Sequence, residues 1–141
     1  MRARSKVATW GAVIALLVAA APAGAAQTRT SSASDTKGWC ALVIRVNTRL
    51  GIMKNKRYVS VRSISLSTWK KVVDAAIANG DGLIALAPSS IKTAEKHQIA
   101  YFKRVKANGY ARTTPLAPLT LAENGQLVTF QKTKCGITFS D

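Results

Sequence analysis

The two cysteines of this chain constrain its fold more than any other feature of the sequence. Cys40 and Cys135 stand near opposite ends of 141 residues, so a bond between them would close most of the chain into a single ring. Whether such a bond forms depends on the compartment, because thiols oxidise outside the cell and stay reduced in the cytosol. The N-terminal sequence, which governs targeting, therefore has to be interpreted first.

The first 25 residues have the pattern of a secretory signal peptide. The segment MRARSK is basic, VATWGAVIALLVAAAP follows without a charge, and Ala23-Gly24-Ala25 provides the small residues that a signal peptidase requires. The apolar run is shorter than the roughly 20 residues that a membrane-spanning helix needs, and it ends at Pro22. We therefore predict cleavage after Ala25 and a secreted, extracellular protein without a transmembrane segment.

In an oxidising compartment, two cysteines in a small domain most simply form one disulfide. A ring that spans residues 40–135 stabilises a fold by about 4–5 kcal/mol in the loop-entropy model, as an upper value. The alternative is a catalytic thiol, which needs a base to form thiolate, and the chain contains a single histidine, His97. We predict the Cys40–Cys135 bridge.

Apolar residues recur every three or four positions along most of the mature chain, which predicts helices. The expected helical segments are residues 39–53, 66–83, 91–107 and part of 117–134. In front of them, residues 26–37 are polar and rich in Ser and Thr, which indicates a flexible leader. Cys40 falls in the first turn of the first segment. Cys135 ends the last one, where Gly136 suits the left-handed position beyond a helix and Ile137 is placed to pack back.

Two places in this pattern allow more than one structure. Residues 79–82, Asn-Gly-Asp-Gly, are a turn signal, but the apolar period is in phase on both sides. We favour a continuous helix there, in which Gly80 permits the close approach of a neighbour. Residues 54–65 fit either a loop or a short strand, since Val59 and Val61 alternate with polar neighbours.

Four amphipathic segments with short connections predict an all-α, four-helix up-down bundle. In that topology the start of the first helix and the end of the fourth lie at the same end of the bundle. The two cysteines stand at those places. Residues 38–141 should therefore form one disulfide-closed helical domain.

Three short motifs are similar to those of small secreted helical domains that are common in actinobacteria. They are WCALVIRV with its early cysteine, LAPSSIKTAEKHQIAYF with Ala-Pro before a helix, and the closing CGI, and together they span roughly residues 38–137. The resemblance implies a disulfide-closed helical bundle in the cell envelope or the medium. The chain departs from the acidic character of that group by being strongly basic, and the resemblance implies no activity and no functional residues.

The mature domain carries a large positive charge. Three of the 21 Lys and Arg residues and none of the six Asp and Glu residues precede the cleavage site, so 18 bases against 6 acids leave about +12. Such a field favours anionic cell-wall polymers, anionic lipid head groups, nucleic acid or acidic proteins, although charge also simply keeps a secreted protein dissolved. Export and the lack of an aromatic stacking platform make nucleic acid the weakest candidate.

Two clusters of basic residues are the candidate anion-binding sites. One surrounds Tyr58 in the segment KNKRYVSVR, and the other forms one face of the helix expected over residues 91–107. The residues are Lys54, Lys56, Arg57 and Arg62 in the first cluster, and Lys92, Lys96, Lys103, Arg104 and Lys106 in the second. The alternative interpretation is that both clusters are only solvated surfaces of the bundle.

No arrangement of residues in the sequence is typical of catalysis or of a metal site. One histidine and scattered carboxylates lack metal-ligand spacing, and Glu95 and His97 point in different directions on a helix because they are two positions apart. Phosphate-binding glycine loops and the GxSxG motif are also lacking. We expect His97 to be solvated, and the protein to have no enzymatic activity, no cofactor and no metal.

These observations predict a small secreted basic protein that acts by binding anionic components of the cell envelope. The alternative is an inhibitor or signalling partner that recognises another protein through a helix face.

Overall fold

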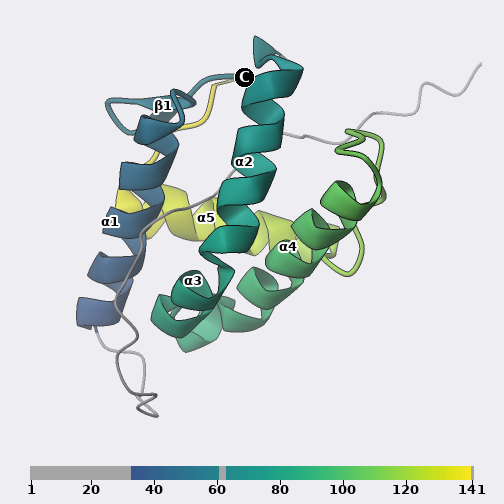
Figure 1. Cartoon of the computed structure of the whole chain (residues 1–141). Coiled ribbons are helices and arrows are strands. Elements are labelled where there is room, and N and C mark those ends of the chain that lie inside the picture. Colours follow the sequence, from purple (N-terminus) through teal and green to yellow (C-terminus); the bar gives the residue numbers. More distant parts are fainter. Residues whose placement is uncertain (1–32, 61–62, 141) are drawn as a thin grey trace, which may run out of the picture.

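The computed structural model describes residues 33–60 and 63–140, which are mostly helical (Figure 1). Five helices and a two-stranded hairpin make up these residues. In chain order they are α1 (Ala33–Arg49), β1 (Met53–Lys54), β2 (Arg57–Tyr58), α2 (Leu66–Ala78), α3 (Gly80–Leu86), α4 (Ser89–Ala107) and α5 (Leu121–Cys135). The predicted signal peptide lies outside the described residues.

Helix α1 begins earlier than its apolar stripe predicts. Its first residue is Ala33, which lies inside the segment 26–37 expected to be a flexible leader. Asp35 in the first turn interacts favourably with the helix dipole and so supports the extra turns in front of the stripe. Cys40 consequently lies about two turns into α1 rather than in its first turn, and Trp39 beside it is fully buried.

The predicted continuous helix over residues 66–83 is wrong, because the chain breaks it at Asn79 into α2 and α3. The side-chain amide of Asn79 donates to the Ala75 carbonyl at 2.9 Å, and its backbone leaves helical geometry at φ −112° and ψ 6°. A side chain that bonds to the preceding turn competes with the helical backbone bonds. The expected close approach at Gly80 does occur, since a Cβ there would lie 2.7 Å from Cγ2 of Ile99 on α4.

The last helix follows its predicted position. It starts after a capping box in which the Thr120 hydroxyl accepts from the Glu123 N–H at 3.1 Å and the Glu123 carboxylate accepts from the Thr120 N–H at 2.9 Å. The helix ends at Cys135, and Gly136 takes the left-handed conformation at φ 66°. Ile137 is buried, as the prediction of a residue packing back requires.

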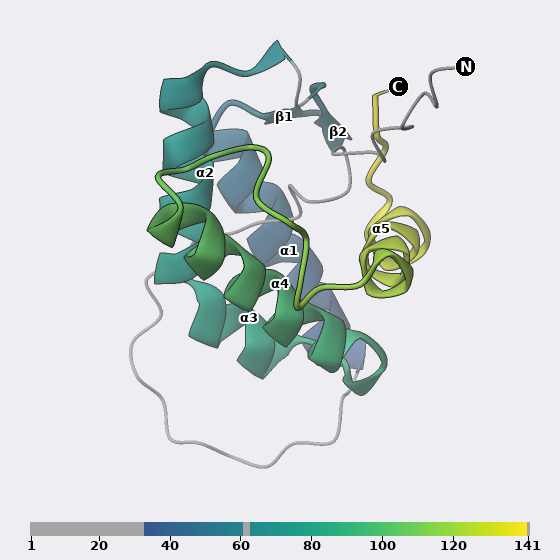
Figure 2. The ribbon, with the colours of Figure 1, turned by 90° about the vertical axis from the view of Figure 1, so that its right-hand side faces the viewer.

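An up-down four-helix bundle is not confirmed. Helix α5 runs across the other helices and is seen nearly end-on in Figure 2, where α1, α2 and α4 are seen from the side. Helix α4 packs against α2, α3 and α5, whereas α1 packs against α3, α5 and β1. The break at Asn79 and the crossing of α5 therefore replace the parallel alignment that four equal helices would have.

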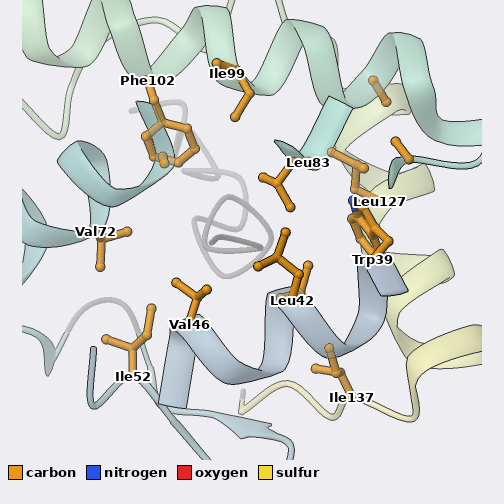
Figure 3. Close-up of a cluster of buried hydrophobic side chains, with 14 of the residues drawn as sticks. Trp39, Leu42, Val46, Ile52, Val72, Leu83, Ile99, Phe102, Leu127 and Ile137 are labelled. Carbon is orange, nitrogen blue, oxygen red and sulfur yellow. The ribbon is translucent and has the colours of Figure 1, made fainter. Parts of the chain in front are cut away.

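The core draws side chains from all five helices and from the segments that flank the hairpin and follow α5 (Figure 3). Trp39 of α1 lies edge-on to Phe130 of α5 with ring centroids 5.4 Å apart, and Trp69 of α2 lies 6.1 Å from Phe102 of α4. Aromatic pairs at these spacings add to the free energy gained by burial. In residues 33–60 and 63–140, no helix has the length and apolar character needed to cross a bilayer.

The predicted Cys40–Cys135 disulfide is confirmed, with 5.2 Å between the two Cα atoms. It joins α1 to the last residue of α5, and the chain then continues beside the hairpin. The Tyr58 N–H donates to the Thr138 carbonyl at 3.0 Å, and the Thr138 N–H donates to the Lys56 carbonyl at 2.9 Å. Residues 54–65, which fitted either a loop or a strand, thus contain a short hairpin to which the C-terminal segment is bonded.

Candidate anion-binding surface

Two carboxylates of the described chain contact basic side chains, and the first is Asp74 on α2, whose side chain is 48% exposed. Its Oδ1 accepts a hydrogen bond from the Tyr110 hydroxyl at 2.9 Å. The same oxygen forms an ion pair with Lys106 Nζ, also at 2.9 Å. The Lys106 ammonium, and to a lesser degree the Tyr110 hydroxyl, hold the pKa of Asp74 below its usual value. Asp74 therefore stays ionised and neutralises a lysine that the sequence assigned to the anion-binding face of α4.

Glu123 is the second of these carboxylates, and it binds His97. Nδ1 of His97 lies 2.8 Å from Oε1 of Glu123, while the other carboxylate oxygen caps α5 through the Thr120 N–H. The bond from the Thr120 backbone, followed by the contact with His97, lowers the pKa of Glu123. His97, which was expected to be solvated, is 39% exposed and is in addition paired with Glu123. The Thr-x-x-Glu spacing of residues 120–123 is a capping-box signal that could have indicated the position of Glu123.

Glu95 is fully buried in the core, and neither of its carboxylate oxygens has a hydrogen-bond partner among the described residues. Burial raises its pKa to about 8, and the nearby indole N–H of Trp39 opposes that rise only partly. The carboxyl is therefore mostly protonated at neutral pH and contributes little negative charge. A signal for its burial is present in the sequence, because Glu95 lies four positions after Ile91 and seven before Phe102 on the buried stripe of α4.

The basic residues predicted on α4 do not act as one free face. Lys96 and Lys103 are exposed and Lys92 is half-buried. Lys106, however, is paired with Asp74, and the Arg104 guanidinium donates to the Ala117 carbonyl in the connection to α5. Two of the five cations predicted there are thus bonded within the protein.

The basic residues predicted in the hairpin are free of such bonds. Lys54, Lys56 and Arg57 are exposed, and neither of the ion pairs found in residues 33–60 and 63–140 involves them. Lys54 and Arg57 stand directly opposite each other in the register of the two strands. Arg62, the fourth predicted member of this cluster, lies outside the described residues.

A pocket with a volume of about 360 Å³ opens beside these cations. Its lining consists of Lys54, Asn55, Arg57, Tyr58, Val59, Thr138 and Ser140. No carboxylate is among these residues. Thr138 and Ser140 come from the C-terminal segment, and no local sequence pattern indicates that they meet the hairpin, because 82 positions separate each of them from its hydrogen-bond acceptor in the hairpin.

Tyr58 connects the pocket to the core. Its side chain is buried, and burial followed by the nearby Glu95 carboxyl raises its pKa well above the usual value, while the Asn47 amide opposes the rise. The phenol is consequently neutral, and Tyr58 adds no charge to the lining of the pocket.

No group of His, Cys, Asp and Glu side chains within the described parts of the chain is arranged to hold a metal ion. The chain matches no protein-family model, no curated protein and no solved structure. Its function therefore has to be inferred from its own residues.

Proposed function

We propose that this protein is exported and acts without catalysis, by binding anionic components of the cell envelope through its basic surface. The observation that carries the proposal is the way in which the fold distributes charge. Asp74 and Glu123 are bonded to a lysine and a histidine, and Glu95 is buried with a raised pKa. The exposed cations of the hairpin have no carboxylate partner among the described residues.

This distribution makes the outer surface more positive than the sequence count suggests. The formal net charge, +15 for the whole sequence and about +12 without residues 1–25, counts Glu95 as negative, although its pKa of about 8 keeps the carboxyl mostly protonated at pH 7. Exposed cations are attracted to a polyanion over about 8–10 Å at physiological salt. Contacts that are weak singly become strong together when several cations meet a repeating anionic polymer.

The test is retention of the oxidised mature protein on an anionic cell-wall polymer at low and at high salt. We expect strong retention at about 20 mM salt and loss of most of it at about 500 mM, because the Debye length falls several-fold over this range. Retention that is unchanged by salt would contradict the proposal. Stoichiometric, salt-insensitive capture of a single protein would instead support recognition through a helix face.

A further inference from the structure

We propose that the pocket between the hairpin and the C-terminal segment binds a phosphate group carried on a polyol, such as a glycerol phosphate or sugar phosphate unit. The inference rests on the proposed function and names the chemical unit that the surface recognises. The pocket volume of about 360 Å³ falls within the range of small-molecule sites, although the pocket is open on one side.

Lys54 and Arg57 line the pocket, and no carboxylate of the described residues is paired with them. Lys54 and Arg57 face each other directly across the two strands. Like charges in this position repel and destabilise a hairpin. An anion between them removes the repulsion, and a guanidinium matches the oxygens of phosphate with two parallel hydrogen bonds.

The turn between the strands is also energetically unfavourable, through its backbone conformation. Asn55 and Lys56 both have positive φ, at 51° and 59°, which is the geometry of a type I′ turn. Glycine is the preferred second residue of such a turn, because a side chain there is strained. The chain has Lys56 instead, so the turn carries a third cation, between the lining residues Asn55 and Arg57, at the expense of backbone strain.

A hydroxyl of the C-terminal segment suits a different part of the ligand. The Ser140 hydroxyl donates to the Tyr58 carbonyl. Because its proton is used, the Ser140 oxygen presents lone pairs and accepts hydrogen bonds. An anion has no proton to give it, whereas the hydroxyls of a polyol do.

The remaining wall is apolar. Val59 lines the pocket and is 38% exposed, and the buried Tyr58 lies next to it in the lining. The C–H groups of a glycerol or a sugar can pack on such a surface. Cations, a hydroxyl acceptor and an apolar wall together match a phosphorylated polyol better than they match inorganic phosphate, a carboxylate or an uncharged sugar.

The experiment is an NMR titration of the oxidised mature protein with glycerol 3-phosphate, inorganic phosphate and glycerol. We expect saturable shifts at residues 54–59 and 138–140 with glycerol 3-phosphate, at least tenfold weaker binding of inorganic phosphate, and no saturable shifts with glycerol. Equal affinity for glycerol 3-phosphate and inorganic phosphate, or no saturable shifts at these residues, would overturn the inference.

Matched variants separate the pocket from the general charge. Arg57→Gln should weaken glycerol 3-phosphate binding at least tenfold, whereas Lys103→Gln on α4, with the same loss of charge, should change it less than twofold. Ser140→Ala should reduce the preference for glycerol 3-phosphate over inorganic phosphate and leave phosphate affinity unchanged. Thermal unfolding of each variant establishes that it is folded, and equal effects of Arg57→Gln and Lys103→Gln would refute the pocket.

The two proposals fail in different ways. Suppose that the protein is retained on the polymer at low salt, but that Arg57→Gln and Lys103→Gln weaken retention and glycerol 3-phosphate binding equally. The proposed surface binding then stands, and the proposed pocket site is refuted. If the protein is not retained on the polymer at low salt, the proposed function fails. The titration with glycerol 3-phosphate still decides whether the pocket binds its ligand.

Discussion

Glu95 is a single carboxyl group that links the stability of the core to pH. Its pKa is 4.5 in the unfolded chain and about 8 in the folded protein, because burial disfavours the charged form. Between these values the unfolded state releases its proton more readily than the folded state. The free energy of unfolding therefore falls as pH rises from 4.5 to 8, by up to roughly 4 kcal/mol at about 1.4 kcal/mol per pH unit.

Glu95→Gln should remove this pH dependence, because an amide does not titrate. We expect the variant to resemble the native protein at pH 5 and to be more stable at pH 8, as measured by urea unfolding at both values. Asp74 and Glu123, whose pKa values are lowered, titrate only in more acidic solution and do not disturb the comparison. Parallel pH profiles for the two proteins would show that the buried carboxyl has no such role.

Lys56 offers a second prediction for a single residue. Lys56→Gly should raise the free energy of unfolding by about 1 kcal/mol, because glycine adopts the positive φ of 59° without strain. The control is Lys56→Ala, which removes the same charge and keeps the strain. A gain in the glycine variant but not in the alanine variant, measured by urea unfolding, identifies the backbone as the cause. Equal stability of both variants would contradict it.

At the scale of the elements, the packing of α3 against α4 requires a residue without a side chain at position 80. Gly80→Ala would place Cβ 2.7 Å from Cγ2 of Ile99, so we expect a loss of about 1–3 kcal/mol from overpacking. Gly82→Ala on the same helix is the matched control, because no atom lies within 4 Å of its Cβ position. That variant should be stabilised by about 0.5–1 kcal/mol through helix propensity. Thermal unfolding of the pair tests the contact, and equal shifts would exclude it.

Helix ends were predicted correctly where neighbouring residues in the sequence determine them. The end of α5 at Cys135 and the left-handed Gly136 depend on neighbouring residues, and the sequence predicted both. The break at Asn79 was missed because the apolar period continues in phase on both sides of it. The cause of the break is the hydrogen bond from the Asn79 side chain to the Ala75 carbonyl, which the period does not reveal. The earlier start of α1 at Ala33 was missed because that part of the helix lacks an apolar stripe.

The candidate site was predicted only in part, for the same reason. The cations Lys54, Lys56 and Arg57 are adjacent in the sequence and were found there. Thr138 and Ser140 meet the hairpin through hydrogen bonds across the whole domain, and no period or motif encodes that contact. Sequence reasoning likewise could not show that Lys106 is bonded to Asp74, because that pair joins two helices.

For the whole molecule, the Cys40–Cys135 bridge is the main covalent constraint. Thiol titration of the unfolded, oxidised protein should find no free thiol in the described chain, in agreement with the structure. Reduction should lower the free energy of unfolding by roughly 2–5 kcal/mol, because it restores the conformational entropy of a long loop in the unfolded chain. Urea unfolding with and without reductant measures the difference. Identical midpoints would show that helix packing alone is sufficient.

The bonding of the C-terminal segment to the hairpin also has a consequence for the order of events in biogenesis. The pocket is lined by residues of the hairpin and by Thr138 and Ser140, which follow about 80 positions later in the chain and are synthesised after it. A nascent or truncated chain has the cations but not these two residues. The proposed binding therefore requires that residues 138–140 have been made and have docked on the hairpin, which couples recognition to the last steps of folding.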